Sequence, residues 1–198
     1  MKIGKYEADE YFRLAKDFHG FAMPGLIVGG FMVDLALKNL PEGEFFDVIC
    51  ETNQCLADAV QLLTPCTMGN GWLKEASTSR FAIIIYNKYT GDGTRVFIDQ
   101  KKLDKWKEIK VWYLKEKDKK EQDTEKIIEQ LLEAGSEYMS IMKVKVKDKY
   151  LAKGKKVSAP VAVCPSCEEV YFKKFGDKCP ACSGNAPYEM ENSQAECT

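Results

Sequence analysis

Apolar residues near the start of the chain repeat with the period of an α-helix. A first helix, predicted to end at Gly20, shows the spacing i, i+3, i+4, i+7 at Tyr11, Leu14, Ala15 and Phe18. A second helix is predicted over residues 24–40, because Pro24 suits a first helical turn. Its apolar residues surround it almost completely, so we expect it to be the buried central helix. Gly29 and Gly30 cost it about 1 kcal/mol each relative to Ala, which is tolerable if another backbone packs closely there.

Strand patterns alternate with shorter helices in the middle of the chain. Residues 45–50, 72–75, 80–89 and 94–100 read as strands, and the uniformly apolar run 81–85 predicts a central strand covered on both faces. A third helix is predicted to start at an Asn53 N-cap, with its apolar face at Leu56, Ala59, Val60 and Leu63.

The rest of the predicted core domain contains both helical and strand patterns. Residues 101–114 favour a short helix, and the charge run 115–123 reads as a solvated helix end or loop. A fourth helix is expected over 127–135 and a half-exposed strand over 142–147. Because helices mix with hairpins rather than forming strict β-α-β units, we predict an α+β core over residues 1–152, with helices packed on a mostly antiparallel sheet. A polar linker, 153–162, leads to a small treble-clef or ribbon-like zinc module with its tail, 163–198.

Composition fits a globular protein and restricts its environment. The 198 residues are 45% hydrophobic and 30% charged, and their net charge of -1 provides no global field toward nucleic acid or membrane. The apolar stretch 18–33 is interrupted by His19 and by Gly and Pro, and the first residues lack a signal-peptide pattern. We therefore expect a cytoplasmic protein that does not insert into membranes.

Cysteine placement gives the strongest chemical signal. The chain has eight cysteines and one histidine, and four of the cysteines form two Cys-x-x-Cys pairs: Cys164, Cys167, Cys179 and Cys182. Two such turns supply four thiolates to one tetrahedral zinc, and a closed shell of this kind is structural. The residues between the pairs, 169–177, predict a hairpin that turns at Gly176. Two redox-active pairs or disulfides are the alternative, but a redox motif needs one pair at a helix start.

Three further segments resemble the family of the formylmethanofuran dehydrogenase E subunit. They are the loop 18–25 (Phe-His-Gly-Phe-Ala-Met-Pro-Gly), the stretch 55–61 (Cys-Leu-Ala-Asp-Ala-Val-Gln) and the turn 64–73 around Cys66. Phe21 and Met23 stand where the family has a histidine and a cysteine. The resemblance implies either a weak core metal site or a plain binding pocket, with candidate ligands His19, Met23, Cys55 and Cys66. On residues alone, His19 is better explained as a histidine whose ring nitrogens are satisfied by backbone groups.

Three functional hypotheses follow. The resemblance implies a metal-binding accessory or regulatory protein, associated with a molybdenum- or tungsten-dependent enzyme of one-carbon metabolism, and a homodimer. A stand-alone enzyme would use Cys66 as nucleophile and His19 as base, the two candidate catalytic residues. An interaction role for the zinc module would favour a protein partner over nucleic acid, because its six charged residues sum to zero: Lys173, Lys174 and Lys178 against Glu168, Glu169 and Asp177. Cys50 and Cys197 have no predicted role.

Overall fold

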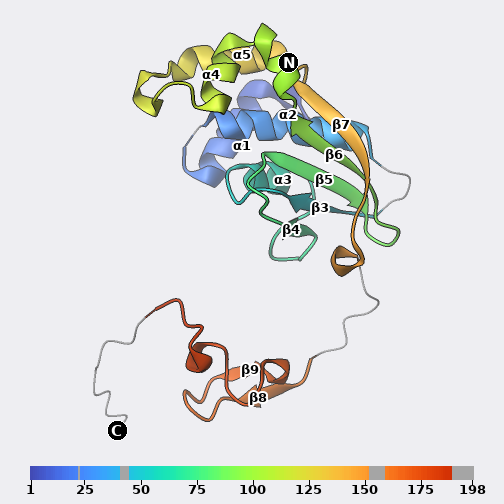
Figure 1. The fold of residues 1–198 in the computed structure, drawn as a ribbon, viewed down its shortest axis with the longest axis vertical. Helices are drawn as coiled ribbons and strands as arrows, with labels where there is room; N and C mark the ends of the chain where they lie inside the picture. The colour runs from blue at the N-terminus through green and yellow to red at the C-terminus, as the bar shows by residue number, and fades with distance from the viewer. Residues whose placement is uncertain (22, 41–44, 152–158, 189–198) are drawn as a thin grey trace. The chain divides into compact units, whose positions relative to one another are not determined.

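A computed structural model describes residues 1–21, 23–40, 45–151 and 159–188. The chain divides into two compact units, Met1–Ala152 and Lys153–Thr198, which we describe separately (Figure 1). Cys197 lies outside the described residues. In the described part, no single helix is long and apolar enough to cross a membrane, and one bent pair of helices meets that criterion by length and composition alone.

The first unit is built on a five-stranded sheet in the order β4-β3-β5-β6-β7. Its strands are β3 (Phe46–Cys50), β4 (Leu73–Glu75), β5 (Ala82–Asn87), β6 (Asp92–Ile98) and β7 (Met139–Lys145). Neighbouring strands are antiparallel except β3 and β4, which are parallel. A short hairpin of β1 (Lys2–Ile3) and β2 (Tyr6–Glu7) precedes the first helix. The mostly antiparallel sheet confirms the predicted fold class.

Five α-helices accompany this sheet: α1 (Ala8–His19), α2 (Pro24–Lys38), α3 (Leu56–Leu63), α4 (Lys107–Leu114) and α5 (Thr124–Ala134) (Figure 1). Short 3-10 helices cover Gln100–Lys105, Lys119–Glu121 and Asp148–Tyr150. The predicted N-cap Asn53 is wrong, because α3 begins after Cys55, whose side chain makes no capping bond. Helix α2 is buried along most of its length, as its all-round apolar pattern predicts.

Apolar clusters pack against both faces of the sheet. One face joins the helices in the main core, where Val48, Ile83 and Ile85 meet α2 residues such as Leu26 and Met32. The other face carries a smaller cluster around Ile49, Tyr86 and Val146, against which Tyr150 and Leu151 pack. Strand β5 therefore contributes to both clusters, which confirms the central strand predicted from residues 81–85.

The second unit contains a two-stranded sheet of β8 (Val161–Val163) and β9 (Val170–Phe172), with 3-10 helices over Lys173–Phe175 and Ala181–Ser183. The predicted hairpin over 169–177 is wrong. Strand β9 pairs with β8, and the residues after β9 form a 3-10 helix instead of a second strand. The chain reverses at the first Cys-x-x-Cys turn instead, where the Glu168 amide donates to the Cys164 carbonyl and the Cys164 amide to the Glu169 carbonyl. Strand β8 also begins inside the segment predicted as linker.

Helices α2 and α3 approach each other closely at Gly29. A Cβ added to Gly29 would lie 2.7 Å from the Ala59 Cβ and 3.3 Å from Leu56 Cδ1. A methyl group therefore does not fit between the two helices unless one of them moves. This contact explains why α2 carries a glycine despite the cost to helix propensity.

We predict that Gly29→Ala lowers the free energy of unfolding by about 1–3 kcal/mol, because overpacking at Ala59 outweighs the gain in helix propensity. Urea denaturation followed by circular dichroism measures the change. Gly69→Ala is the matched control, since the nearest atom to its added Cβ is 3.9 Å away. Equal stability of Gly29→Ala and the wild type would show that the helices are not in close contact.

Candidate functional site

The four cysteines of the second unit lie together with their sulfurs facing one point. All four Sγ atoms are within 4.8 Å of one another, and those of Cys167 and Cys179 are 3.8 Å apart. Sulfurs placed tetrahedrally about 2.3 Å from a metal are themselves about 3.8 Å apart. Backbone amides support the cluster, with Cys179 N–H donating to Cys164 Sγ at 3.5 Å and Cys182 N–H to Cys179 Sγ at 3.4 Å. These residues fit a four-coordinate metal ion.

The rest of this unit offers little apolar burial to hold it together. Among its described residues, Cys164 and Cys179 are the buried ones. The apolar side chains of β8 and β9 are mostly exposed, with Val170 at 67% and Phe172 at 50%. A segment with so small a core needs another source of folding free energy, which metal coordination by the cysteines can supply.

The cysteine cluster leaves no coordination position for a substrate. Four protein sulfurs complete the tetrahedral shell that is typical of structural sites. Backbone amides that donate to Cys164 lower the pKa of its thiol, chiefly the amide of Cys179, and so favour the thiolate that binds metal. The arrangement therefore suits a structural metal centre.

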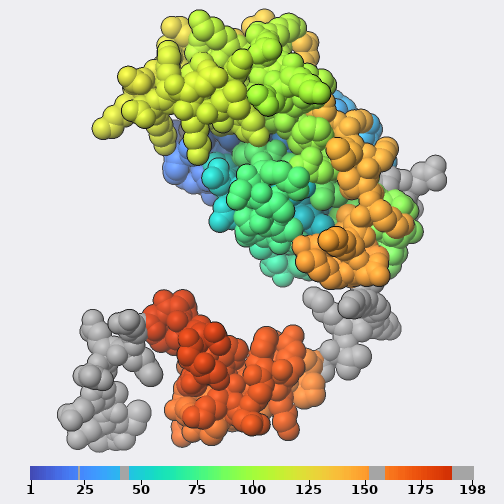
Figure 2. All heavy atoms as spheres, in the orientation of Figure 1, coloured from blue at the N-terminus to red at the C-terminus, as the bar shows by residue number. Residues whose placement is uncertain are grey.

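A separate cavity of about 740 Å³ opens in the first unit. Its walls come from the start of α2, the segment before α3, the segment leading into β5, and the residues that end α4 and begin α5. Figure 2 shows the yellow-green residues after α4 beside the cyan residues near the start of α3. Two of the candidate core residues, Met23 and Cys55, line this cavity.

His19 is held by a carboxylate rather than by backbone groups. Its Nδ1 lies 2.6 Å from Asp58 Oδ2, which joins the end of α1 to α3. Its ring packs against Phe21, with 5.0 Å between the ring centroids. Asp58 is part of the stretch 55–61 that carries the family resemblance. The resemblance therefore pointed to this helix, but it did not indicate that Asp58 pairs with His19.

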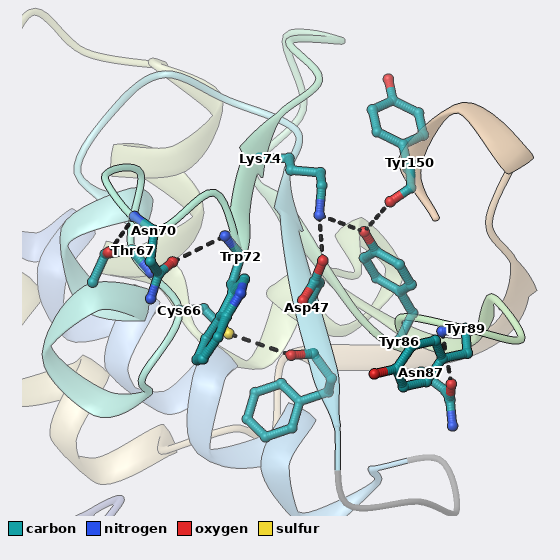
Figure 3. Close-up of polar contacts among 11 residues, drawn as sticks. Asp47, Cys66, Thr67, Asn70, Trp72, Lys74, Tyr86, Asn87, Tyr89 and Tyr150 are labelled. Atoms are coloured by element: carbon teal, nitrogen blue, oxygen red, sulfur yellow. Dashed lines mark hydrogen bonds and ion pairs between the residues drawn. The ribbon is translucent and has the colours of Figure 1, made fainter. Parts of the chain in front are cut away.

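Cys66 is buried in the core and hydrogen-bonded (Figure 3). Its thiol donates to the Phe46 carbonyl at 3.7 Å, and its amide donates to Thr64 Oγ1 at 3.0 Å. Burial raises the pKa of this thiol to about 11. The side chain of Asn70 fixes the following turn by accepting from the amides of Thr67 and Trp72. Cys66 thus has the environment of a structural thiol.

Figure 3 also shows a buried polar group that the sequence pattern did not reveal. Lys74 donates to Asp47 and, at 3.1 Å, to the Tyr86 hydroxyl, which donates to the Tyr150 carbonyl at 2.9 Å. Burial opposes the charge of Lys74, but the bonds to Asp47 and Tyr86 raise its pKa. The one sequence feature that could have indicated this polar group is Asp47, a charged residue inside the otherwise apolar run 45–50. The group ties β3, β4 and β5 to the residues after β7.

The candidate core ligands are therefore spread over three environments. Met23 and Cys55 line the cavity, His19 pairs with Asp58, and Cys66 is bonded to Phe46. Within the described ranges, one group of three or more His, Cys, Asp or Glu residues has its ligand atoms close enough together to hold a metal. That group is the four-cysteine cluster.

An α+β unit joined to a four-cysteine module defines a two-part metal-binding protein, and comparisons with known proteins give its family. The family described as "FmdE, Molybdenum formylmethanofuran dehydrogenase operon" matches residues 18–148, and the "FmdE treble clef zinc finger" family matches 155–189. The chain belongs to the FmdE family, and its C-terminal unit is a treble clef.

A solved structure and a curated relative agree with this assignment to different extents. The chain is 45% identical to a tungsten formylmethanofuran dehydrogenase FmdE-like protein from Syntrophus aciditrophicus, with a TM-score of 0.86 over 95% of this chain and 98% of that one. It is 32% identical over 100 residues to a "Probable S-adenosyl-L-methionine-binding protein" from Archaeoglobus fulgidus, a match to 46% of this chain. The match spans only about a quarter (27%) of that relative's length.

We predict that Cys66 does not react with iodoacetamide at pH 8 in the folded protein. A pKa of about 11 leaves about one thiol in a thousand ionised at that pH, and the sulfur is also buried. Labelling of native and guanidinium-unfolded protein, read by peptide mass spectrometry, measures the rates. Cys55, which is partly exposed, is the internal comparison. A Cys66 that labels equally fast in both states would restore it as a candidate nucleophile.

Proposed function

We propose that this protein is a zinc-containing accessory or regulatory protein of a molybdenum- or tungsten-dependent enzyme in one-carbon, methanogenesis-type metabolism. The FmdE family membership and the likeness to a tungsten FmdE-like protein support the association. The four-cysteine cluster is the observation that carries the metal-binding part. Thiolate ligands of this kind require reducing conditions, and we propose a cytoplasmic location.

Zinc is the metal that suits the cluster best. Four thiolates in a tetrahedron match its preferred coordination, whereas magnesium and calcium prefer oxygen ligands. The 3.8 Å separation of Cys167 and Cys179 equals the spacing expected around zinc. We assign the ion a structural role, because the thiolates complete its shell.

We predict that purified protein contains one zinc per chain and that Cys164→Ser loses it, because three thiolates bind zinc far more weakly than four. Inductively coupled plasma mass spectrometry measures the stoichiometry. Cys55→Ser is the matched control, since it removes a thiol from the cavity of the other unit. Full zinc content in Cys164→Ser, or its loss in Cys55→Ser, would contradict the assignment.

The geometry of the first unit supports an accessory role over a Cys66 enzyme. The Cys66 thiol is buried with a raised pKa, and the His19 ring is paired with Asp58. Neither residue is arranged as the activated nucleophile and base that covalent catalysis requires. We retain the stand-alone enzyme only as the alternative that the labelling experiment tests.

The named ligand of the Archaeoglobus relative does not suit the cavity. S-adenosyl-L-methionine carries a sulfonium and an ammonium cation against one carboxylate, whereas the cavity is lined by three lysines and one aspartate. Like charges repel, and this lining therefore disfavours a cationic ligand. We do not extend that binding activity to this chain.

We also propose a homodimer. Strand β7 lies at the edge of the sheet and exposes Ile141 and Met142 by 45% and 50%. Unpaired edge strands with apolar side chains can pair with a second chain. This edge supports self-association.

We predict that the tagged protein, isolated from its native host, elutes as a dimer and copurifies with a molybdenum- or tungsten-containing enzyme. Size-exclusion chromatography with light scattering gives the mass, and metal analysis of the bound fraction gives the partner. Ile141→Lys/Met142→Lys introduces charge at the β7 edge and should yield monomers. A monomeric wild type would contradict the dimer, and a preparation without molybdenum or tungsten would contradict the accessory role.

A further inference from the structure

The lining of the cavity in the first unit includes both basic and apolar residues. Its charged lining residues are Lys115, Lys117, Lys119 and Asp118, which sum to +2. In the part of the chain that the structure describes, none of these three lysines has an ion pair. A basic excess inside a concave surface raises the local concentration of anions.

The same cavity is also lined by apolar and aromatic side chains. Phe81, Trp112 and Tyr113 contribute rings, and Met23 and Ile127 contribute aliphatic surface. A volume of about 740 Å³ lies within the range of cavities that hold small organic molecules. The lining therefore suits a ligand with a planar or apolar body as well as a charge.

One wall of the cavity is held in place by an ion-pair network around the buried carboxylate of Glu51. Glu51, which is 3% exposed, accepts two bonds from Arg95 at 2.7 and 2.9 Å and pairs with Arg80 at 2.8 Å. The Thr78 hydroxyl donates to the Glu51 carboxylate at 3.1 Å, and the Thr78 amide donates to the Glu51 carbonyl at 2.9 Å. Ser77 and Ser79, the neighbours of Thr78, line the cavity. This wall is thus preorganised before any ligand enters.

We propose that the cavity binds an organic anion, in which a phosphate or carboxylate group is joined to a planar or apolar body. The lysines of segment 115–119 hold the anionic group, and the rings of Phe81, Trp112 and Tyr113 contact the body. Met23 and Cys55, the residues that directly precede α2 and α3, also line the cavity, and both belong to the stretches that resemble the family. This site goes beyond the metal-binding role, and it lies in the unit that does not contain the cysteine cluster.

Isothermal titration calorimetry of the full-length protein tests the proposal with three probes that share one body. They are 1-naphthyl phosphate, 1-naphthoate and the neutral 1-naphthalenemethanol. We expect at least one of the anions to bind about tenfold more tightly than the neutral probe, and its affinity to fall as salt is raised. Which anion binds more tightly distinguishes a phosphate ligand from a carboxylate ligand.

Variants locate the binding. Lys117→Gln/Lys119→Gln should weaken the anion about five- to tenfold, as expected for two exposed charges that act together. Lys101→Gln/Lys149→Gln removes two exposed lysines outside the cavity and should bind like the wild type. Phe81→Ala should weaken the anionic and neutral probes alike, because it removes contact with the shared body.

Three outcomes would overturn the proposal: no binding by either anion, equal binding of the neutral probe, or unchanged binding in Lys117→Gln/Lys119→Gln. The zinc content measured in Cys164→Ser and in its control Cys55→Ser reports on the cysteine cluster of the second unit. A failure of the anion site therefore leaves the zinc assignment intact, and the loss of zinc binding would leave the anion site untouched.

Discussion

The contact between α2 and α3 at Gly29 and Ala59 determines how the first unit is assembled. Because Gly29 contributes no side chain, α3 packs directly against the backbone of α2, and the N-terminal ends of the two helices also lie side by side. A Cβ on Gly25 would be 3.4 Å from Cys55 Sγ, so the start of α2 contacts the residue that precedes α3. The same pair brings Asp58 within reach of His19 at the end of α1. The floor of the cavity is thus a consequence of one close helix–helix approach.

The two units are stabilised by different means. The first buries an apolar helix against a sheet and has apolar clusters on both sheet faces, which is sufficient for a domain of its size. The second buries little besides Cys164 and Cys179 and depends on its sulfur ligands. A protein of this design has one unit that buries a large apolar core and one whose residues converge on a four-cysteine cluster.

The features that the sequence predicted correctly are those that depend on residues near one another in the chain. The apolar surround of α2, the uniform run of β5 and the spacing of the four cysteines each specify an environment without reference to distant residues. What could not be predicted depends on pairing across the chain. The β8–β9 ladder, the parallel β3–β4 pair and the Lys74–Asp47 contact all join segments whose sequences contain no mark of their partners.

The residues that line the cavity could likewise be predicted only in part from the sequence. Met23 and Cys55 were identified through the family resemblance, but the basic wall from segment 115–119 was interpreted as a solvated charge run. The position of these basic residues depends on how α4 and α5 pack near the start of α2. The spacing of apolar residues along the chain does not indicate that packing. Conversely, His19 and Cys66 had suggestive residue types, and the structure gives each a local partner instead of a shared site.

The central claim is that one structural zinc, bound by four cysteines, organises the C-terminal unit of an FmdE-family protein. X-ray absorption at the zinc edge tests it most directly. We expect four sulfur ligands at about 2.3 Å and no nitrogen or oxygen ligand. A spectrum with nitrogen or oxygen in the first coordination shell would place the metal at another site, such as one involving His19, and would contradict the claim.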